Sequence, residues 1–201
     1  MNIPTDTLAE QVRGAAFRRL LRTSVPAAPA QLADDLDHPD HDIRVAIEDL
    51  TGQGWLRLDT DGRVVGSAGL SIHPDRHQIE LDGTTFWTWC AYDILGIFAA
   101  LRATGHARSS SPTSGQPLEI DFHDGRPEPS TLVLFLPDDD FAACCTNTYE
   151  QWCPNSNLFH TTDDAASWAT DHGITGTVLT LPDAAEHGAQ RWRSLTQSQP
   201  T

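Results

Sequence analysis

Apolar side chains recur at helical spacing through the N-terminal quarter of the chain and predict three successive helices. The first is predicted from Asp6 to about Arg22, the second over residues 31–36, and the third from Asp40 to Gly52. Two short strands, at residues 54–58 and 63–66, then flank a turn with Asp-Gly chemistry. The pattern therefore predicts a helical N-terminal unit that ends in a β-hairpin.

The rest of the chain mixes short strands and helices without a regular βαβ alternation. Strands are predicted at residues 78–82, 118–122, 131–136 and 177–181, and helices at residues 90–104, 162–172 and 183–192. Residues 109–116 are predicted to be a loop, and the strands at 118–122 and 131–136 are predicted to pair antiparallel across the turn near Gly125. The expected class is α+β, with a mixed or antiparallel sheet flanked by helices.

Three helices followed by a hairpin resemble a winged helix-turn-helix, which commonly binds DNA. The third helix, however, carries only one arginine, Arg44, against the acids Asp42, Glu48 and Asp49. A helix that reads a DNA groove needs basic and amide side chains instead. We therefore predict a winged-helix-like domain over residues 1–75 that packs on a catalytic domain over residues 76–201 and does not read DNA.

Composition limits the partners and the compartment. The 201 residues include 13 Lys plus Arg against 28 Asp plus Glu, a formal net charge of −15, which disfavours nucleic acid and anionic membranes. No apolar run is long enough to span a bilayer, and residues 1–10 lack the pattern of a secretion signal. We expect a cytoplasmic protein whose four cysteines are reduced and serve metal binding or catalysis.

Cys90 and Asp93 stand at the predicted start of an apolar helix. Side chains three positions apart share one helix face, so the thiol and the carboxyl can meet one substrate. Unpaired N–H groups in the first turn favour a thiolate, whereas an ionised Asp93 opposes it, so the pair is expected to share a proton. The alternative is an inert core cysteine beside a carboxylate that the helix terminus favours.

Three further cysteines, Cys144, Cys145 and Cys153, follow within one short segment. Their spacing lacks the paired Cys-x2-Cys knuckles of structural zinc sites, although His123 and His160 are candidates to complete one. Thiolates select soft metal ions over hard ones, so a soft metal is the better match. The vicinal pair Cys144 and Cys145 is either a mobile metal-exchange site or two packed small residues.

The segment Trp89-Cys90-Ala91-Tyr92-Asp93, together with a cysteine fifteen residues before Trp168, resembles the alkylmercury (organomercurial) lyase family. The similarity extends over about two thirds of the chain. It includes the hairpin around Asp61-Gly62 and Val65-Gly66, the strand at 79–81, the stretch Ser109-Ser110-Ser111 to Gly115, and Ala165-Ala166-Ser167-Trp168. The family also has an N-terminal winged-helix-like domain that does not need DNA.

The resemblance implies cleavage of a carbon–mercury bond by protonolysis. Cys90, Asp93 and Cys153 would be the catalytic residues and would all contact the metal, the two cysteines as thiolate ligands and Asp93 as the proton shuttle. No organic cofactor is implied, and the Hg(II) product would pass to external thiols or to a metal-accepting protein. If both sulfurs bind one mercury, they are expected within about 4 to 6 Å of each other in the metal-free fold.

The sequence departs from the better-known family members at three places. Pro154 follows the second catalytic cysteine where they have another cysteine, Cys144 and Cys145 lie in an apparent insertion, and Ser111 replaces a further cysteine. These differences leave the substrate open. The alternatives are a related enzyme that acts on an organometalloid or a metabolite, and a thiol protein that binds or senses metal without turnover.

Overall fold

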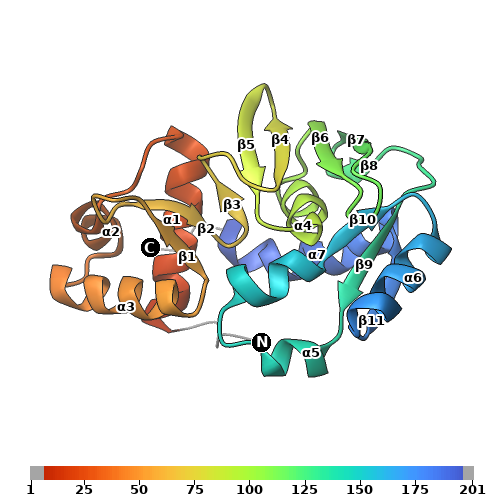
Figure 1. The fold of residues 1–201 in the computed structure, drawn as a ribbon. Coiled ribbons are helices and arrows are strands. Elements are labelled where there is room, and N and C mark those ends of the chain that lie inside the picture. Colours follow the sequence, from red (N-terminus) through yellow and green to blue (C-terminus); the bar gives the residue numbers. More distant parts are fainter. Residues whose placement is uncertain (1–6, 197–201) are drawn as a thin grey trace.

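The structure, a computed structural model, describes residues 7–196. Its larger sheet has eight strands in the order β1, β2, β3, β5, β4, β6, β7, β8, and neighbouring strands pair antiparallel (Figure 1). These are β1 (Leu56–Leu58), β2 (Val64–Ser67), β3 (Leu70–Ser71), β4 (His77–Leu81), β5 (Thr84–Thr88), β6 (Gly105–Ser110), β7 (Pro117–His123) and β8 (Arg126–Pro127).

A second, smaller sheet holds β10, β9 and β11 in that order, again antiparallel. The strands are β9 (Val133–Pro137), β10 (Asn157–Phe159) and β11 (Gly176–Thr180), and α6 (Thr162–His172) packs beside them. Phe135, Phe159 and Trp168 form a small aromatic core between this sheet and α6. Antiparallel sheets flanked by helices make the α+β class that the sequence predicts.

The three N-terminal helices form as the periodicity predicts. They are α1 (Leu8–Thr23), α2 (Pro29–Leu36) and α3 (Asp40–Gly52), and they pack on one another beside β2. The Thr7 hydroxyl accepts a hydrogen bond from the backbone N–H of Glu10 at 3.3 Å, which caps α1. The predicted start at Asp6 lies outside the described residues. Figure 1 shows this helical group at one side of the molecule, with α6 and the smaller sheet at the other.

The N-terminal hairpin is continuous with the rest of the larger sheet. Gly66 pairs with Ser71, and Leu70 pairs with Thr88, so β2 connects through β3 to β5. The Ser67 hydroxyl also donates to the carbonyl of Arg13 at 2.8 Å, which fixes α1 on the sheet. One buried core runs through both parts of the chain. The predicted division into domains 1–75 and 76–201 stays a prediction.

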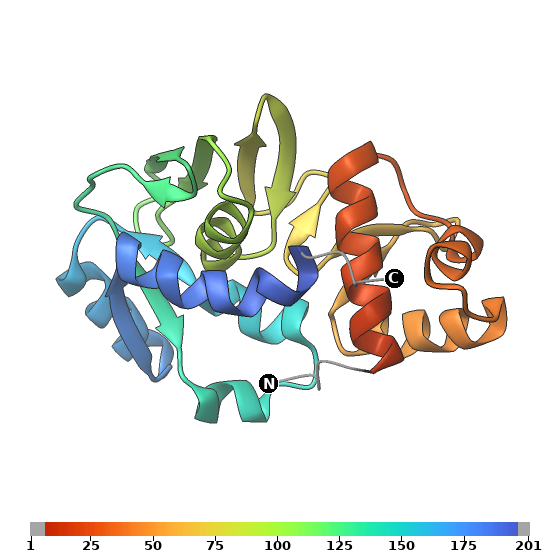
Figure 2. The same ribbon diagram turned by 180° about the vertical axis from the view of Figure 1, so that it is seen from behind.

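Helix α4 (Ala91–Leu101) lies at the centre of the fold and is buried from its first residue to Phe98. Helix α7 (Leu181–Thr196) crosses it closely, as Figure 2 shows. At the crossing, Gly96 faces the Trp192 indole and Gly188 faces Gly96, and a Cβ on either glycine would overlap these neighbours. Although α4 is strongly apolar, no helix within residues 7–196 is long and apolar enough to cross a membrane.

Two predicted boundaries after the central helix are wrong. The helix ends at Leu101, with Arg102 in the left-handed conformation (φ 53°), and does not continue to Gly105. Gly105 instead begins β6, which pairs with β4 and extends to Ser110, inside the predicted loop 109–116. Pairing with a sheet edge supplies hydrogen bonds that local sequence signals do not report.

The structure also contains a strand that was not predicted, β5 at Thr84–Thr88. The predicted pairing of 118–122 with 131–136 is wrong, because β7 pairs with β6 and with the short β8, whereas β9 lies between β10 and β11. The short β8 pairs with β7 at the edge of the larger sheet, and the chain then leaves this sheet and enters the smaller one at β9.

His77 is a buried polar residue in the larger sheet, 5% exposed. Its Nδ1 lies 2.7 Å from the Ser109 hydroxyl, and its Nε2 has no hydrogen-bond partner within residues 7–196. Burial lowers the pKa of His77 to about 4, and the neighbouring charge of Arg76 lowers it as well. The imidazole is therefore neutral in the folded protein at the pH where an unfolded histidine is already protonated.

This shift predicts a loss of stability in mild acid. Between pH 6.5 and 4 the unfolded chain binds a proton on His77 that the folded chain does not, so the free energy of unfolding falls as the pH falls. Over this range the free energy of unfolding of the His77→Asn variant, measured with urea, is expected to fall by about 3 kcal/mol less than that of the parent protein. Asparagine can keep the bond to Ser109 without titrating. Equal pH slopes in the two proteins would contradict the assignment.

Candidate active site

The start of α4 joins Cys90 and Asp93 through the backbone. Cys90 is extended (φ −144°, ψ 169°) and caps the helix, directly after the strand β5 and Trp89. Its backbone N–H donates to Asp93 Oδ2 at 2.8 Å, while the backbone N–H of Asp93 points at the Cys90 side chain. This reciprocal arrangement is a capping box in which cysteine takes the place of serine. It holds the thiol and the carboxyl on one face, as the spacing predicts.

Cys153 reaches the same point from a different part of the chain. It follows the π-helical turn η1 (Thr148–Trp152) and begins the short 3₁₀ helix η2 (Cys153–Asn155). The backbone N–H of Ala91 donates to the carbonyl of Ser156 at 3.1 Å, which ties this segment to the first turn of α4.

The ligand atoms of Cys90, Asp93 and Cys153 all lie within 4.8 Å of one another. The predicted approach of the two sulfurs is therefore confirmed. The three residues are 0%, 5% and 2% exposed, so two thiols and one carboxyl face each other away from bulk water.

Burial governs the protonation of this group. It raises the pKa of the Cys90 thiol well above its usual value, and the hydrogen bond with Cys153 and the charge of Asp93 raise it further. It also raises the pKa of Asp93 to about 7, although the hydrogen bonds with Cys90 act in the opposite direction. The hydrogen bond with Cys90 lowers the pKa of Cys153, but burial and the Asp93 charge outweigh it, and the net shift is upward.

The partial positive charge of the helix N-terminus does not by itself make Cys90 a thiolate in the metal-free protein, and the expected sharing of a proton between Cys90 and Asp93 stays a prediction. Desolvation of the charged form outweighs the partial positive charge of the helix N-terminus at Cys90. Both thiols keep their protons at neutral pH. The Asp93 carboxyl, with a pKa of about 7, can release a proton or take one up there.

Gly69 lets the chain pass directly against the Asp93 carboxyl. It has a φ of 88°, and a Cβ at this position would overlap the carboxyl group. Its carbonyl also accepts a hydrogen bond from the backbone N–H of Trp89 at 3.1 Å, which aligns the approach to Cys90. No motif in the sequence singles out this glycine, because its contact with Asp93 is made only in the fold.

We expect Gly69→Ala to impair the site far more than Gly83→Ala. Both glycines have positive φ, 88° and 84°, so both variants carry the same backbone strain of about 1 kcal/mol. Only the methyl at position 69 must displace Asp93, since nothing lies within 4 Å of a Cβ on Gly83. Thermal unfolding measures the stability of both variants, and hydrocarbon release from an organomercurial measures the activity of the site. Equal losses of activity would show that the approach of Gly69 does not position the carboxyl.

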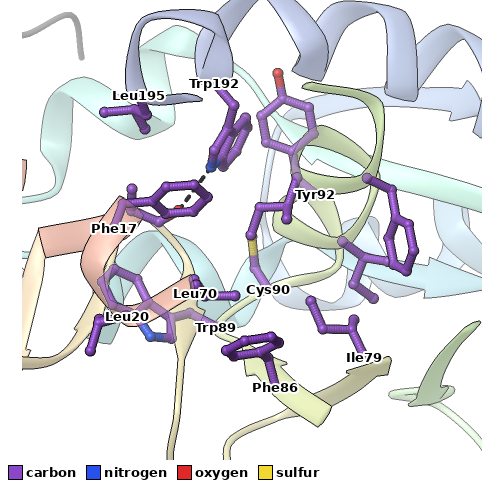
Figure 3. Close-up of a cluster of buried hydrophobic side chains, with 14 of the residues drawn as sticks. Phe17, Leu20, Leu70, Ile79, Phe86, Trp89, Cys90, Tyr92, Trp192 and Leu195 are labelled. Atoms are coloured by element: carbon purple, nitrogen blue, oxygen red, sulfur yellow. Dashed lines mark hydrogen bonds between the residues drawn. The ribbon is translucent and has the colours of Figure 1, made fainter. Parts of the chain in front are cut away.

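A cleft of about 990 Å³ opens from this group to the surface. Its lining includes the aromatic residues Trp89, Tyr92, Trp152 and Trp192. Tyr92 lies edge-on to Trp152 and Trp192, with ring centroids 6.2 and 5.3 Å away. The Trp192 indole N–H donates to the carbonyl of Ala68 at 2.9 Å. Figure 3 shows Cys90, Tyr92 and Trp192 in this aromatic surrounding. Asp93 and Cys153 also line the cleft, so an apolar group that lies against these rings can reach them.

The segment that carries Cys153 is held down by Tyr149. The guanidinium groups of Arg57 and Arg76 both lie over the Tyr149 ring, 4.1 and 4.7 Å from its centroid. Its hydroxyl donates to Asp75 Oδ2 at 3.2 Å, and its ring meets Trp89 edge-on at 5.5 Å. Stacked cations and a buried carboxylate make this a specific docking point. Sequence reasoning missed it, because its members are spread over three distant stretches.

The other candidate ligands do not join the site. Within residues 7–196, Cys90, Asp93 and Cys153 form the single group of three or more potential ligands that could share a metal ion. The zinc site considered with His123 and His160 is therefore wrong; both histidines are exposed on the surface. Cys145 is buried in the cleft wall, whereas Cys144 is exposed.

The sequence profile of the alkylmercury lyase family matches residues 70–192, which include all three residues of this group. The chain belongs to the alkylmercury lyase family. The resemblance seen around Trp89–Asp93 is thereby confirmed.

Individual family members agree with this assignment. The alkylmercury lyase of Staphylococcus epidermidis is 29% identical over 191 residues, which cover 92% of this chain and 85% of the relative. That of Streptomyces lividans is 30% identical over 183 residues, or 90% and 80% of the two chains. The crystal structure of the mercury-bound form of MerB2 shares the fold, with a TM-score of 0.80 at 22% identity over 93% of this chain and 92% of that chain.

Proposed function

We propose that this protein cleaves the carbon–mercury bond of organomercurials, with Cys90 and Cys153 as mercury ligands and Asp93 as the proton carrier. The observation that carries the proposal is the buried group of two thiols and one carboxyl, whose ligand atoms lie within 4.8 Å of one another. Two soft sulfur ligands beside one transferable proton match a soft metal that is bonded to carbon.

The substrate arrives as an organomercury cation bound to a small thiolate. One protein thiol displaces this ligand, so a sulfur–mercury bond forms as another breaks, and the thiol proton leaves on the displaced ligand. The second protein thiol then binds the same metal and gives its proton to Asp93. Because the pKa of Asp93 is about 7, the carboxylate can accept this proton at neutral pH and remains able to donate it.

Cleavage follows when Asp93 donates that proton to the carbon. Two thiolates on mercury raise the electron density at the metal, which makes the bound carbon basic enough to accept a proton. The carbon–hydrogen bond forms as the carbon–mercury bond breaks, and a hydrocarbon leaves. Hg(II) stays between Cys90 and Cys153. Exclusion of water from the group favours transfer from Asp93 over transfer from solvent.

These reaction steps need no organic cofactor, since the two thiols and the carboxyl supply every metal ligand and proton. The remaining partners are external thiols, or a metal-accepting protein, that remove Hg(II). The aromatic cleft offers room for aryl as well as alkyl groups, with Trp89, Tyr92 and Trp152 in contact with the organic part.

The direct test is to incubate the purified protein with methylmercury or phenylmercury and excess thiol, and to measure methane or benzene. Catalytic formation of one mole of hydrocarbon per mole of substrate consumed is expected. A protein that binds these compounds stoichiometrically without releasing hydrocarbon would instead be a thiol trap or sensor. If the protein neither binds these compounds nor releases hydrocarbon, the site acts on a different substrate.

We also propose that residues 1–75 are a winged-helix-like domain that supports the catalytic part and does not bind DNA. The exposed side of α3 carries Asp42, Glu48 and Asp49, and its single arginine, Arg44, pairs with Asp40 at 2.6 Å. Helix α3 therefore has no unpaired Lys or Arg that could contact a DNA phosphate. The segment also holds Cys153 in place, because the backbone N–H of Thr148 donates to the carbonyl of Gln53 at 2.8 Å.

Binding to random duplex DNA is therefore expected to be undetectable at physiological salt. The acidic helix and the net charge of −15 repel the phosphates. Fluorescence anisotropy with a labelled duplex at two salt concentrations measures this directly. Submicromolar affinity that weakens with added salt would overturn the proposal.

A further inference from the structure

The vicinal cysteines Cys144 and Cys145 lie at the end of a short helix beside the cleft. They end the short helix α5 (Asp139–Cys144), whose N-terminus is capped by the Asp138 side chain through a 2.9 Å hydrogen bond from Phe141 N–H. Cys145 is 8% exposed and lines the same cleft as Cys153 and Asp93. Cys144, its neighbour in the chain, is exposed to solvent. The two cysteines thus lie side by side in the chain, one in the cleft wall and the other at the surface.

Cys145 and Cys153 line the same cleft, and the Cys145 side chain is mostly buried in its wall. Burial raises the pKa of Cys145, and the charges of Cys144 and Cys153 raise it further. The side-chain hydrogen bond of Cys145 is a weak one, 3.4 Å from Sγ to the carbonyl of Phe141, which a bond to a metal ion can replace.

The buried position of the catalytic thiols creates a need for such a group. Cys90 and Cys153 are 0% and 2% exposed, so an external thiol must enter the cleft to remove Hg(II) from them. Thiol exchange proceeds by attack of a sulfur at the bound metal, and its rate depends on access. A thiol already present in the cleft wall acts at a high effective concentration.

We propose that Cys144 and Cys145 form a second Hg(II) site, which takes the ion from Cys153 and Cys90 and presents it to thiols in solution. This inference rests on the proposed function, because it concerns the product of that reaction. Within residues 7–196 neither cysteine belongs to the group formed by Cys90, Asp93 and Cys153. The pair therefore acts after cleavage and is not part of the cleavage site.

The transfer is a series of ligand exchanges without oxidation or reduction. Cys145 forms a sulfur–mercury bond as the bond to one catalytic cysteine breaks, and its proton goes to the departing thiolate. Cys144 then replaces the other catalytic cysteine in the same way, which leaves Hg(II) on the vicinal pair. An external dithiol or two external thiols complete the release by the same exchange, and the catalytic thiols are protonated again for the next substrate.

The test separates cleavage from release. The full chain in excess is mixed with phenylmercury acetate, benzene is measured in a single turnover, and glutathione is then added while protein-bound mercury is followed by rapid desalting. In the Cys144→Ser/Cys145→Ser variant we expect parental benzene formation but mercury release slowed by about tenfold or more. The matched control, Ala143→Ser, adds a hydroxyl at an exposed neighbour and is expected to release mercury at the parental rate.

Two outcomes would overturn the inference. Unchanged mercury release in the double variant would show that external thiols reach the catalytic pair directly. Loss of single-turnover benzene in a folded double variant would place the vicinal pair in the cleavage chemistry instead. Loading the protein with HgCl2 instead of phenylmercury measures mercury release without any cleavage step. Failure of the proposed function is recognised separately, because the parent protein would then form no benzene.

A binding experiment provides a second, independent measurement. The Cys90→Ser/Cys153→Ser variant with one equivalent of HgCl2 is expected to retain one Hg(II) per chain after desalting. The bound ion should protect Cys144 and Cys145 from N-ethylmaleimide, as mapped by mass spectrometry. A variant that lacks all four cysteines should retain none. Unprotected Cys144 and Cys145 in the first variant would rule out the second site.

Discussion

Asp93→Asn is expected to lower the rate of carbon–mercury cleavage by at least about a hundredfold, because general acid–base catalysis contributes roughly 10²- to 10⁴-fold. Asparagine keeps the shape of the side chain, and its oxygen can still accept the hydrogen bond from the Cys90 backbone N–H. It has no proton to deliver to carbon. Both thiols remain, so the number of phenylmercury ions bound per chain should not change. Single-turnover benzene formation and equilibrium binding measure the two quantities separately.

The free energy of unfolding of the same variant is expected to depend on pH differently from that of the parent, and its measurement also checks that the variant folds. The pKa of Asp93 is raised to about 7, so between pH 4 and 7 the folded protein binds a proton that the unfolded chain does not. The contribution of Asp93 to stability is present below pH 4 and is lost as the pH rises through 7. Relative to the parent, Asp93→Asn should therefore gain about 4 kcal/mol in the free energy of unfolding between pH 4 and pH 8.

These two readouts together decide the role of Asp93. A variant that released hydrocarbon at close to the parental rate would show that the proton comes from water or another group. Asp93 would then be only a helix-terminus charge. A pH-independent difference in stability would show that the carboxyl does not titrate in the fold, even if activity were lost.

Cys153→Ser is expected to lower single-turnover cleavage by roughly a thousandfold or more, because groups that act as one unit lose nearly all of their effect when one member is removed. Cys90 would remain as the single soft ligand among the three residues whose atoms lie within 4.8 Å. Serine is a hard ligand that holds its proton, so it neither binds mercury tightly nor supplies electron density for protonation of the carbon. Binding of phenylmercury should weaken as well, in contrast to the Asp93 variant.

The matched control for Cys153→Ser is Ser156→Ala on the same segment. The Ser156 side chain is fully buried, and its hydroxyl has no hydrogen-bond partner within residues 7–196, so its removal tests whether the segment tolerates a small change. The control is expected to keep parental benzene formation. If Cys153→Ser cleaved phenylmercury at the rate of this control, mercury would need only one protein thiol, and the two-thiol mechanism would be wrong.

Local patterns in the sequence determined the parts of this protein that depend on neighbours along the chain. The helical periodicity gave α1, α2 and α3, because each helix is stabilised by one apolar face at regular spacing. The pairing of Cys90 with Asp93 follows from a spacing of three residues, and the capping box makes that contact inside one turn. The family resemblance was likewise visible in the short Trp89–Asp93 segment, and it extended to Cys153 by a fixed distance from Trp168.

Only the tertiary structure decided how Cys153 meets that pair and what surrounds it. The hydrogen bond from Ala91 to Ser156 and the contacts of the Tyr149 ring with two arginines join segments far apart in sequence. The close approach of Gly69 to Asp93 is another such contact.

Burial likewise comes from the whole fold, and at the Cys90 thiol its effect on the pKa outweighs that of the helix terminus. Desolvation depends on every group packed around a side chain, whereas a helix terminus depends on a few residues. The sequence could therefore name the chemical groups, but the environment that sets their protons is a property of the packed molecule.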